Sequence, residues 1–185
     1  MTSGPLHEFA DAFEKMPGLD GPVSVFNDAS EKLTENEDLR EILSGSRIGT
    51  HLHPGIVHMP IGMAVGALVV DLTLGDEGNA AAGVLSGATL ATAVPAIVTG
   101  LADYERIPSH EYRRLGAAHA LANVAANTLT LVSLVGRLAG ARTLARLTLA
   151  GAVTSYLVGG LLGGHLAHSE DSPTDEANQD ESFLE

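Results

Sequence analysis

The chain of 185 residues contains no cysteine, no tryptophan and only two lysines. Without cysteine there is no disulfide, no thiolate metal site and no iron–sulfur cluster held by the chain's own thiolates, so histidine is the main candidate metal ligand. A basic patch is also missing, which argues against nucleic acid as a partner. The sequence has no nucleophile–base set, Walker loop or dinucleotide fingerprint, so it favours a cofactor-binding or electron-transfer subunit over an enzyme that acts alone.

Acidic residues gather at the two ends of the chain. Residues 1–50 hold ten acids against four bases, residues 169–185 hold seven acids and no base, and the stretch between them holds six of each. A neutral middle with two acidic ends is typical of a membrane core with solvated flanks. We therefore divide the chain into an acidic N-terminal cap (1–50), a four-span transmembrane domain (51–168) and an acidic tail (169–185) that we expect to be disordered.

Four segments in the middle are apolar on every face, unlike the helices of a soluble bundle, which carry a polar stripe. Each has about 20 residues, which at 1.5 Å per residue matches a hydrocarbon core of about 30 Å. The predicted fold class is all-α, a four-helix transmembrane bundle with one or two short amphipathic helices between Val25 and Leu43. The expected spans are Ile56–Leu74, Ala80–Leu101, Ala117–Leu138 and Leu144–Leu166. Glycine pairs four residues apart, such as Gly62 with Gly66, Gly83 with Gly87, and Gly160 with Gly164, are expected to let these helices approach closely.

Seven histidines fall at one face of this predicted topology. We call the membrane face on which residues 1–50 lie side A, and the opposite face side B. The connection between the second and third spans, expected to be a loop that carries Asp103, Tyr104, His110, Arg113 and Arg114, also lies on side A. Because imidazole at membrane depth is usually a ligand or a proton relay, this one-sided distribution indicates a site near side A. The seven residues are His51, His53, His58, His110, His119, His165 and His168.

The stretch HLHPGIVHMPIGM (51–63) forms the entry to the first span. Pro54 suits the first turn of a helix, and Pro60 cannot donate a hydrogen bond to the carbonyl of Ile56. We therefore expect an irregular but fixed entry that presents its histidines from a rigid corner.

Three further polar residues follow a helical spacing in the third span. His119, Asn123 and Asn127 recur at i, i+4 and i+8, so they share one face, which must point into the bundle where partners exist. The alternative, for the asparagines and also for His119, is that they only form the hydrogen bonds that hold helices together. Asp71, near the other end of the first span, has two interpretations: a polar partner inside the bundle, or the side B interface, which we favour because the turn GDEG lies close by.

Four motifs in order resemble a bacterial and archaeal membrane domain catalogued only as a domain of unknown function. They are LREILSGSRIGTHLHPGIVHMPIG, TGLADYERI, YRRLGAAHALAN and LLGGHLAH, and together they cover about residues 39–168. Some members of that family carry a Rieske-type iron–sulfur domain after the fourth helix, which implies a role in electron transfer, with haem or a quinone. The residues that match the family pattern are His53, Asp71, Asp103, Arg114, His119, Asn123, Gly163, Gly164 and His165, with His58 matching one branch. No Rieske domain follows in this chain, so we expect any electron partner to be a separate protein or a quinone.

Three hypotheses for function remain open. The first is an electron carrier that binds haem b, with His53 or His58 opposite His119, His165 as the alternative ligand, and Asn123 and Arg114 as further cofactor-binding residues. The second is a non-haem copper, iron or zinc site. Its candidate ligands are His51, His53, His58, His119 and His165. The third is a non-catalytic scaffold or partner of a redox complex, whose polar residues satisfy one another.

Arginines flank the spans unevenly. Side A has five near its span ends and side B has three, which favours cytoplasmic termini. We expect a multi-pass protein of a prokaryotic cytoplasmic membrane, surrounded by the lipid bilayer; its self-association into an oligomer stays open.

Overall fold

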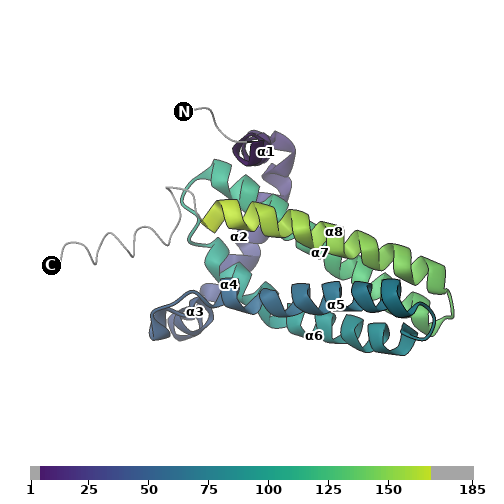
Figure 1. The fold of residues 1–185 in the computed structure, drawn as a ribbon. Coiled ribbons are helices and arrows are strands. Elements are labelled where there is room, and N and C mark those ends of the chain that lie inside the picture. Colours follow the sequence, from purple (N-terminus) through teal and green to yellow (C-terminus); the bar gives the residue numbers. More distant parts are fainter. Residues whose placement is uncertain (1–4, 168–185) are drawn as a thin grey trace.

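A computed structural model describes residues 5–167 of the chain (Figure 1). This part contains eight α-helices, two short 3-10 helices (Pro17–Leu19 and Ser46–Ile48) and no strand, which confirms the all-α prediction. The α-helices are α1 (Pro5–Glu14), α2 (Asp20–Thr34), α3 (Glu37–Ser44), α4 (Leu52–Ile56), α5 (His58–Leu74), α6 (Asn79–Tyr104), α7 (His110–Leu138) and α8 (Arg142–Ala167). His168 and the tail 169–185, which we expect to be disordered, lie outside the described residues.

The long helices α5 to α8 run side by side as two hairpins, α5 with α6 and α7 with α8 (Figure 1). Four helical stretches are long and apolar enough to cross a membrane, namely Leu52–Leu74, Asn79–Tyr104, His110–Leu138 and Arg142–Ala167. The α5–α6 and α7–α8 turns lie at one end of the bundle, which is side B. The α6–α7 connection and helices α1 to α3 lie at the other end, side A.

The first span is interrupted as the two prolines predict. Helix α4 ends at Ile56, Val57 forms a turn, and α5 begins at His58. Pro60 has no N–H to donate to Ile56, so the α-helical hydrogen-bond ladder cannot continue unbroken through this point. The short helix α4 therefore carries His53 as a separate corner packed against α6.

Small side chains form much of the bundle core. Ala64, Ala67, Ala126 and Ala152 are fully buried, which brings helix backbones close together as in other membrane bundles. At Gly62, Gly87 and Gly160 of the predicted pairs, an added Cβ would meet nothing within 4 Å, so no neighbouring helix packs against these positions. The prediction of close helix contact at these three positions is wrong, since spacing alone does not tell which face of a helix is covered.

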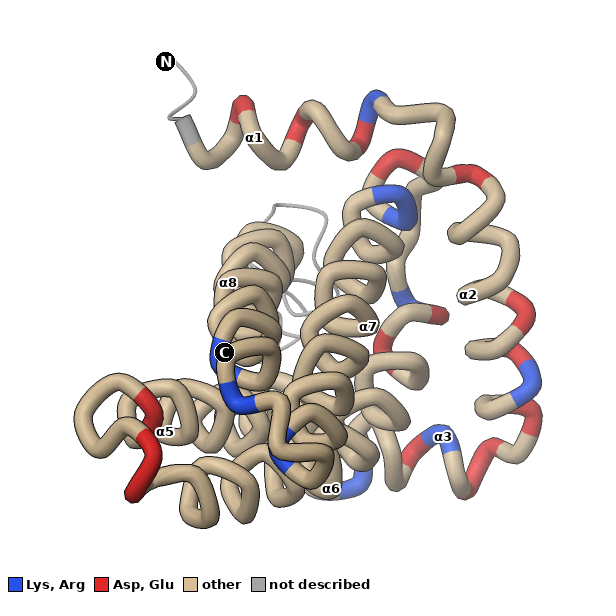
Figure 2. Tube along the Cα trace, turned by 90° about the vertical axis from the view of Figure 1, so that its right-hand side faces the viewer, with Lys and Arg blue, Asp and Glu red and all other residues tan. Residues whose placement is uncertain are grey.

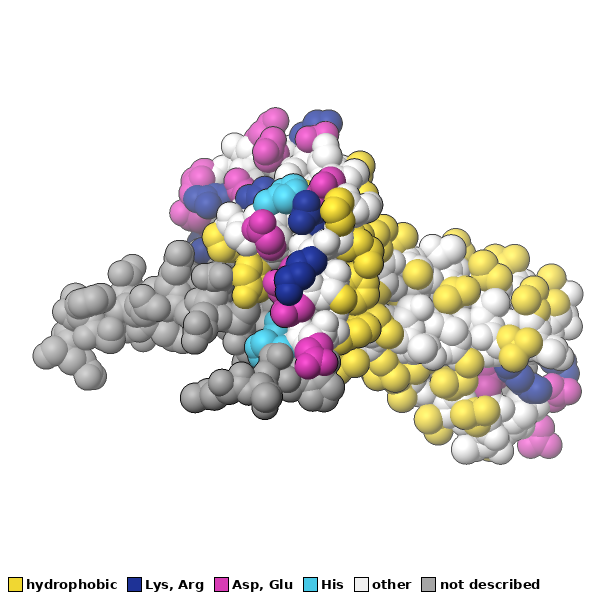
Figure 3. Space-filling view, turned by 90° about the horizontal axis from the view of Figure 1, so that it is seen from above, with side chains coloured by type: hydrophobic (Ala, Val, Ile, Leu, Met, Phe, Trp, Pro, Cys, Tyr) yellow, Lys and Arg dark blue, Asp and Glu magenta, His cyan; other side chains and the backbone are white. Residues whose placement is uncertain are grey.

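The outer surface of the bundle is apolar. Large side chains stand exposed along all four spans, among them Leu72, Val84, Val135 and Leu147, each more than half exposed. In Figure 3 hydrophobic side chains are spread over the bundle, whereas charged side chains gather over the cap and in a small group at the far end. A bundle in water would bury this surface, so its exposure fits a lipid environment.

The connection between the second and third spans is shorter than predicted. We expected a loop through residues 102–116, but α6 continues to Tyr104 and α7 begins at His110. The Ser109 side chain accepts a hydrogen bond from the backbone N–H of Tyr112 at 3.2 Å and caps α7. A search for apolar runs stops where charged residues begin, so it assigns the charged turns at the ends of these helices to the loop. These turns carry Asp103, His110, Arg113 and Arg114.

Helices α1 to α3 form the cap and wrap around one flank of the bundle at side A. In Figure 2 the bundle is seen end-on, α1 crosses above it, and α2 and α3 descend beside α7 and α6, carrying most of the charged residues. The Ser30 hydroxyl donates to the carbonyl of Leu101 at 2.6 Å, and Arg113 Nη1 donates to Asn27 Oδ1 at 2.7 Å. Helices α2 and α3 correspond to the amphipathic helices predicted between residues 25 and 43, whereas α1 lies outside the predicted range.

Arg114 joins the cap to the third span. Its Nε donates to Asp20 Oδ1 at 2.7 Å, its Nη1 donates to the carbonyl of Glu14 at 3.1 Å, and His110 Nε2 lies 2.9 Å from the same Asp20 oxygen. The hydrogen bond from Arg114, and then that from His110, lowers the pKa of Asp20. The ionised form of the Asp20 carboxylate is therefore the one that Arg114 and His110 bind in the docked cap.

Docking of the cap will depend on pH in the acidic range. Because the folded-state pKa of Asp20 is lowered, its contribution is complete above the unfolded value of about 4 and is lost as the pH falls through the lower folded value. Since the chain has no cysteine, two spin labels on introduced cysteines in α2 and α6 can report the distance between these helices. We expect a narrow distribution of distances at pH 7 that broadens as the pH falls through the lowered pKa of Asp20, and a broader distribution at pH 7 in Asp20→Asn than in the wild type. The same narrow distribution in Asp20→Asn would contradict this role.

Candidate histidine site

Two of the predicted histidines meet inside the bundle near side A. His53 projects from α4 and His119 from α7, and their ring centroids lie 6.1 Å apart with an angle of 84° between the ring planes. Both side chains are partly buried. The irregular entry of the first span thus brings one imidazole to face another from the third span.

Backbone carbonyls determine which ring nitrogen carries the proton. His53 Nδ1 lies 2.9 Å from the carbonyl oxygen of Ala96, and His119 Nδ1 lies 2.7 Å from that of Gly159. A carbonyl oxygen can only accept, so each neutral imidazole is protonated on Nδ1 and keeps its lone pair on Nε2. This arrangement is the one in which metal-ligating histidines are usually held, because the second nitrogen sets the orientation and the basicity of the ring.

Two glycines make room for the rings. A Cβ at Gly100 would lie 2.7 Å from His53 Cε1, and a Cβ at Gly163 would lie 2.7 Å from His119 Cε1. Any larger residue at either position would push the imidazole away. These glycines are therefore needed for close approach of a side chain to a helix, a requirement that spacing between glycines does not reveal.

Alanine substitutions in α8 will separate this packing role from helix propensity. Gly160→Ala is expected to stabilise the protein by up to about 1 kcal/mol, since alanine favours a helix over glycine and nothing lies near its Cβ. Gly163→Ala is expected to destabilise it by about 1–3 kcal/mol through overpacking against His119. Unfolding in mixed detergent micelles followed by circular dichroism measures both, and equal effects at the two positions would refute the role given to Gly163.

A polar row continues from His119 along α7. Asn123 Nδ2 donates to the carbonyl of His119 at 2.8 Å and lies 3.3 Å from His119 Nε2, and Asn127 Nδ2 donates to the carbonyl of Asn123 at 2.8 Å. The Tyr156 hydroxyl of α8 donates to Asn127 Oδ1 at 2.9 Å. The row faces the bundle interior, as its spacing predicts, and one of its members is tied to a second helix.

The other candidate residues lie apart from this pair. His51 Nδ1 is 3.7 Å from Asp103 Oδ1, and the exposed His58 has its Nδ1 3.4 Å from the carbonyl of Gly55. His165 packs against His7 of α1 with ring centroids 4.6 Å apart, and Arg114 binds the cap. Among residues 5–167 no three His, Asp or Glu side chains come together in a way that could hold a metal ion.

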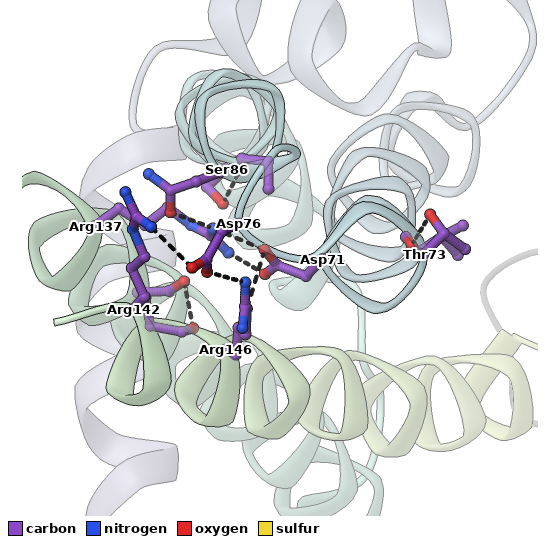
Figure 4. A network of polar contacts seen from close by, with 12 residues as sticks. Asp71, Thr73, Asp76, Ser86, Arg137, Arg142 and Arg146 are labelled. Atoms are coloured by element: carbon purple, nitrogen blue, oxygen red, sulfur yellow. Dashed lines mark hydrogen bonds and ion pairs between the residues drawn. The ribbon is translucent and has the colours of Figure 1, made fainter. Parts of the chain in front are cut away.

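A second polar cluster lies at side B (Figure 4). Asp71 of α5 and Arg137 of α7 form a two-pronged ion pair, with Arg137 Nη1 2.9 Å from Asp71 Oδ1, and their side chains are 1% and 3% exposed. Arg137 Nη1 also donates to Asn79 Oδ1 at 3.2 Å. Asp71 therefore has a polar partner inside the bundle, and its interpretation as an interface residue is wrong.

Outside this pair the cluster reaches the surface. The Asp76 carboxylate accepts a hydrogen bond from Arg146 Nη2 at 2.7 Å and lies 3.0 Å from Arg142 Nη1.

The sequence contains a signal for Arg137 that our prediction did not use. Arg137 follows His119 by 18 residues, which is five turns of 3.6 residues and places both residues on the same face of α7.

Comparisons with known proteins give one match. No curated protein and no solved structure matches the chain. Residues 49–171 match the family model described as "Predicted membrane protein (DUF2231)", a match that covers more than half of the chain and contains all four spans. The chain therefore belongs to this family of membrane proteins.

Proposed function

We propose that this membrane protein is an electron-transfer subunit that binds haem b between His53 and His119. The observation that supports this most strongly is the facing pair of imidazoles, held by Ala96 and Gly159 so that each keeps its Nε2 lone pair. His53 and His119 would hold the haem, and their ring centroids lie 6.1 Å apart, so both imidazoles lie within reach of one metal ion.

The number of available ligands favours haem over a bare metal ion. Haem iron takes no more than two protein ligands because the porphyrin supplies the other four, whereas zinc, copper and non-haem iron usually take three or more protein ligands. Within residues 5–167 only two candidate ligands face each other at this site. A copper, iron or zinc site built on the same pair remains the second candidate.

The chain's own residues would orient the ligands and tune them. The carbonyls of Ala96 and Gly159 accept the Nδ1 protons, which fixes the two rings and raises the basicity of Nε2. Asn123 Nδ2 lies 3.3 Å from His119 Nε2 and can donate to its lone pair in the free protein; it would have to release that lone pair when a metal binds there. Haem b, when bound, supplies reversible one-electron chemistry. We place the protein in a prokaryotic cytoplasmic membrane with both termini in the cytoplasm, on the distribution of arginines.

An absorption spectrum of the detergent-purified protein, titrated with haem b and combined with metal analysis, tests this proposal. We expect one haem per chain and a low-spin spectrum whose Soret band sharpens on reduction with dithionite. A protein that takes up no haem but holds stoichiometric copper, iron or zinc would support the second candidate. One that binds neither would overturn both and leave a scaffold.

A further inference from the structure

A hollow lies between α1 and the side A end of α8. Its volume is about 410 Å³ and it is lined by Leu6, His7, Gly160, Leu161, Gly164 and His165. The two imidazoles in its wall touch each other edge to face, with ring centroids 4.6 Å apart. Nothing in the proposed role of His53 and His119 uses this hollow.

The hollow and the His53–His119 pair are on opposite faces of the same helix. Gly159 accepts the His119 Nδ1 proton through its carbonyl, and Gly163 packs against the His119 ring. Gly160, one residue further, is exposed and lines the hollow. Because glycine has no side chain, little more than the backbone of α8 separates His119 from a molecule bound in the hollow.

Helix α1 places the hollow where lipid tails meet the aqueous face. It lies across the end of the bundle rather than along it (Figure 2), with Ala10 buried among α7 and α8 residues. Two large apolar side chains of α1 stay exposed: Leu6, which lines the hollow, at 51% and Phe9 at 41%. An amphipathic helix of this kind lies in the plane of a membrane interface, so the hollow beside it is reached from the bilayer.

Charge restricts the kind of molecule that fits. Helix α1 carries Glu8, Asp11 and Glu14, which repel an anionic head group. The leucines offer an apolar wall, and a ring N–H of His7 or His165 can donate to a neutral carbonyl oxygen. A neutral, membrane-soluble ring that bears carbonyl groups satisfies all three conditions.

We propose that the hollow binds the head ring of a lipid-soluble quinone. This inference rests on the proposed electron-transfer function, because it names the partner that would exchange electrons with a centre at His53 and His119. The imidazoles of His7 and His165 hold the carbonyl groups, and the open face of Gly160 receives the ring.

Binding of a decyl-chain ubiquinone analogue to the full chain in lipid nanodiscs tests the site. Gly160→Leu fills the hollow, and Gly87→Leu is the matched control, because a Cβ at either glycine meets nothing within 4 Å. We expect saturable binding to the wild type and to Gly87→Leu, and a loss of at least tenfold in affinity in Gly160→Leu. An azido derivative of the analogue should label α1 and the last turns of α8. Equal binding in the two variants, no binding to the wild type, or displacement by phosphatidylglycerol would overturn the proposal.

The two proposals fail separately in this experiment. Quinone binding is measured without haem, and haem uptake is measured from the absorption spectrum of the same samples. If the protein takes up haem normally and Gly160→Leu still binds quinone as the wild type does, only the quinone proposal is refuted. If Gly160→Leu loses quinone binding but the protein takes up no haem, only the haem proposal is refuted.

Discussion

His119→Ala will lose the low-spin haem spectrum and at least about 100-fold in haem affinity, since changes to residues that merely support a metal ligand already cost about 10–100-fold. His53→Ala should give the same result, because the ring centroids of the two imidazoles lie 6.1 Å apart and each would supply one ligand in the proposed site. Titration of the detergent-purified variants with haem b, followed by absorption, measures the loss.

The matched control is His58→Ala. His58 is exposed, and its Nδ1 makes one long contact, 3.4 Å, to the carbonyl of Gly55. We expect wild-type affinity in this variant. His119→Met guards against loss of the fold, because methionine can still ligate the iron and raises the reduction potential. Unchanged haem binding in both His53→Ala and His119→Ala would show that these two histidines are not the haem ligands and would contradict the proposal.

Arg137→Met will destabilise the protein by about 3–5 kcal/mol, because it leaves the Asp71 carboxylate uncompensated in a buried site. The pair joins the first span to the third, and its side chains are 3% and 1% exposed. Replacing both residues by apolar ones of similar volume is expected to recover most of the loss, because no charge then remains in the interior. Reversible unfolding in mixed detergent micelles measures these free energies.

Arg142→Ala is the control for this prediction. Its side chain is 48% exposed and pairs with Asp76, which is 63% exposed, so its loss should cost no more than about 1 kcal/mol. If Arg137→Met and Arg142→Ala lower the free energy of unfolding equally little, Asp71 is hydrated in the membrane-bound protein, and the ion pair does not hold the first and third spans together.

Much of the fold could be predicted from apolar runs. The four spans, their order and the break before α5 follow from hydropathy, length and the positions of Pro54 and Pro60. The C-terminal end of α6 and the N-terminal end of α7 could not be placed in the same way, because both are charged. The start of α7 depends on the Ser109 cap and on the contacts of Arg114 with Asp20 and of Arg113 with Asn27. Helix termini outside the hydrocarbon are set by tertiary contacts rather than by burial in lipid.

The candidate site was predictable in part. Spacing places His119 and Asn123 on one inward face, and the one-sided distribution of histidines indicates side A. Spacing does not tell which imidazoles meet: the structure pairs His119 with His53 and pairs His165 with His7. Those pairings depend on the packing of α4 against α6 and of α1 against α7 and α8, which are contacts between segments far apart in the chain.

Low-temperature electron paramagnetic resonance of the oxidised protein with one haem b bound tests the central claim most directly. The claim is that His53 and His119 are both axial ligands, in rings fixed at 84° to each other by Ala96 and Gly159. Nearly perpendicular imidazole planes predict a strongly anisotropic low-spin signal, which His58→Ala keeps and His53→Ala loses. A high-spin signal in the wild-type protein, or a low-spin signal that survives in both His53→Ala and His119→Ala, would contradict the account.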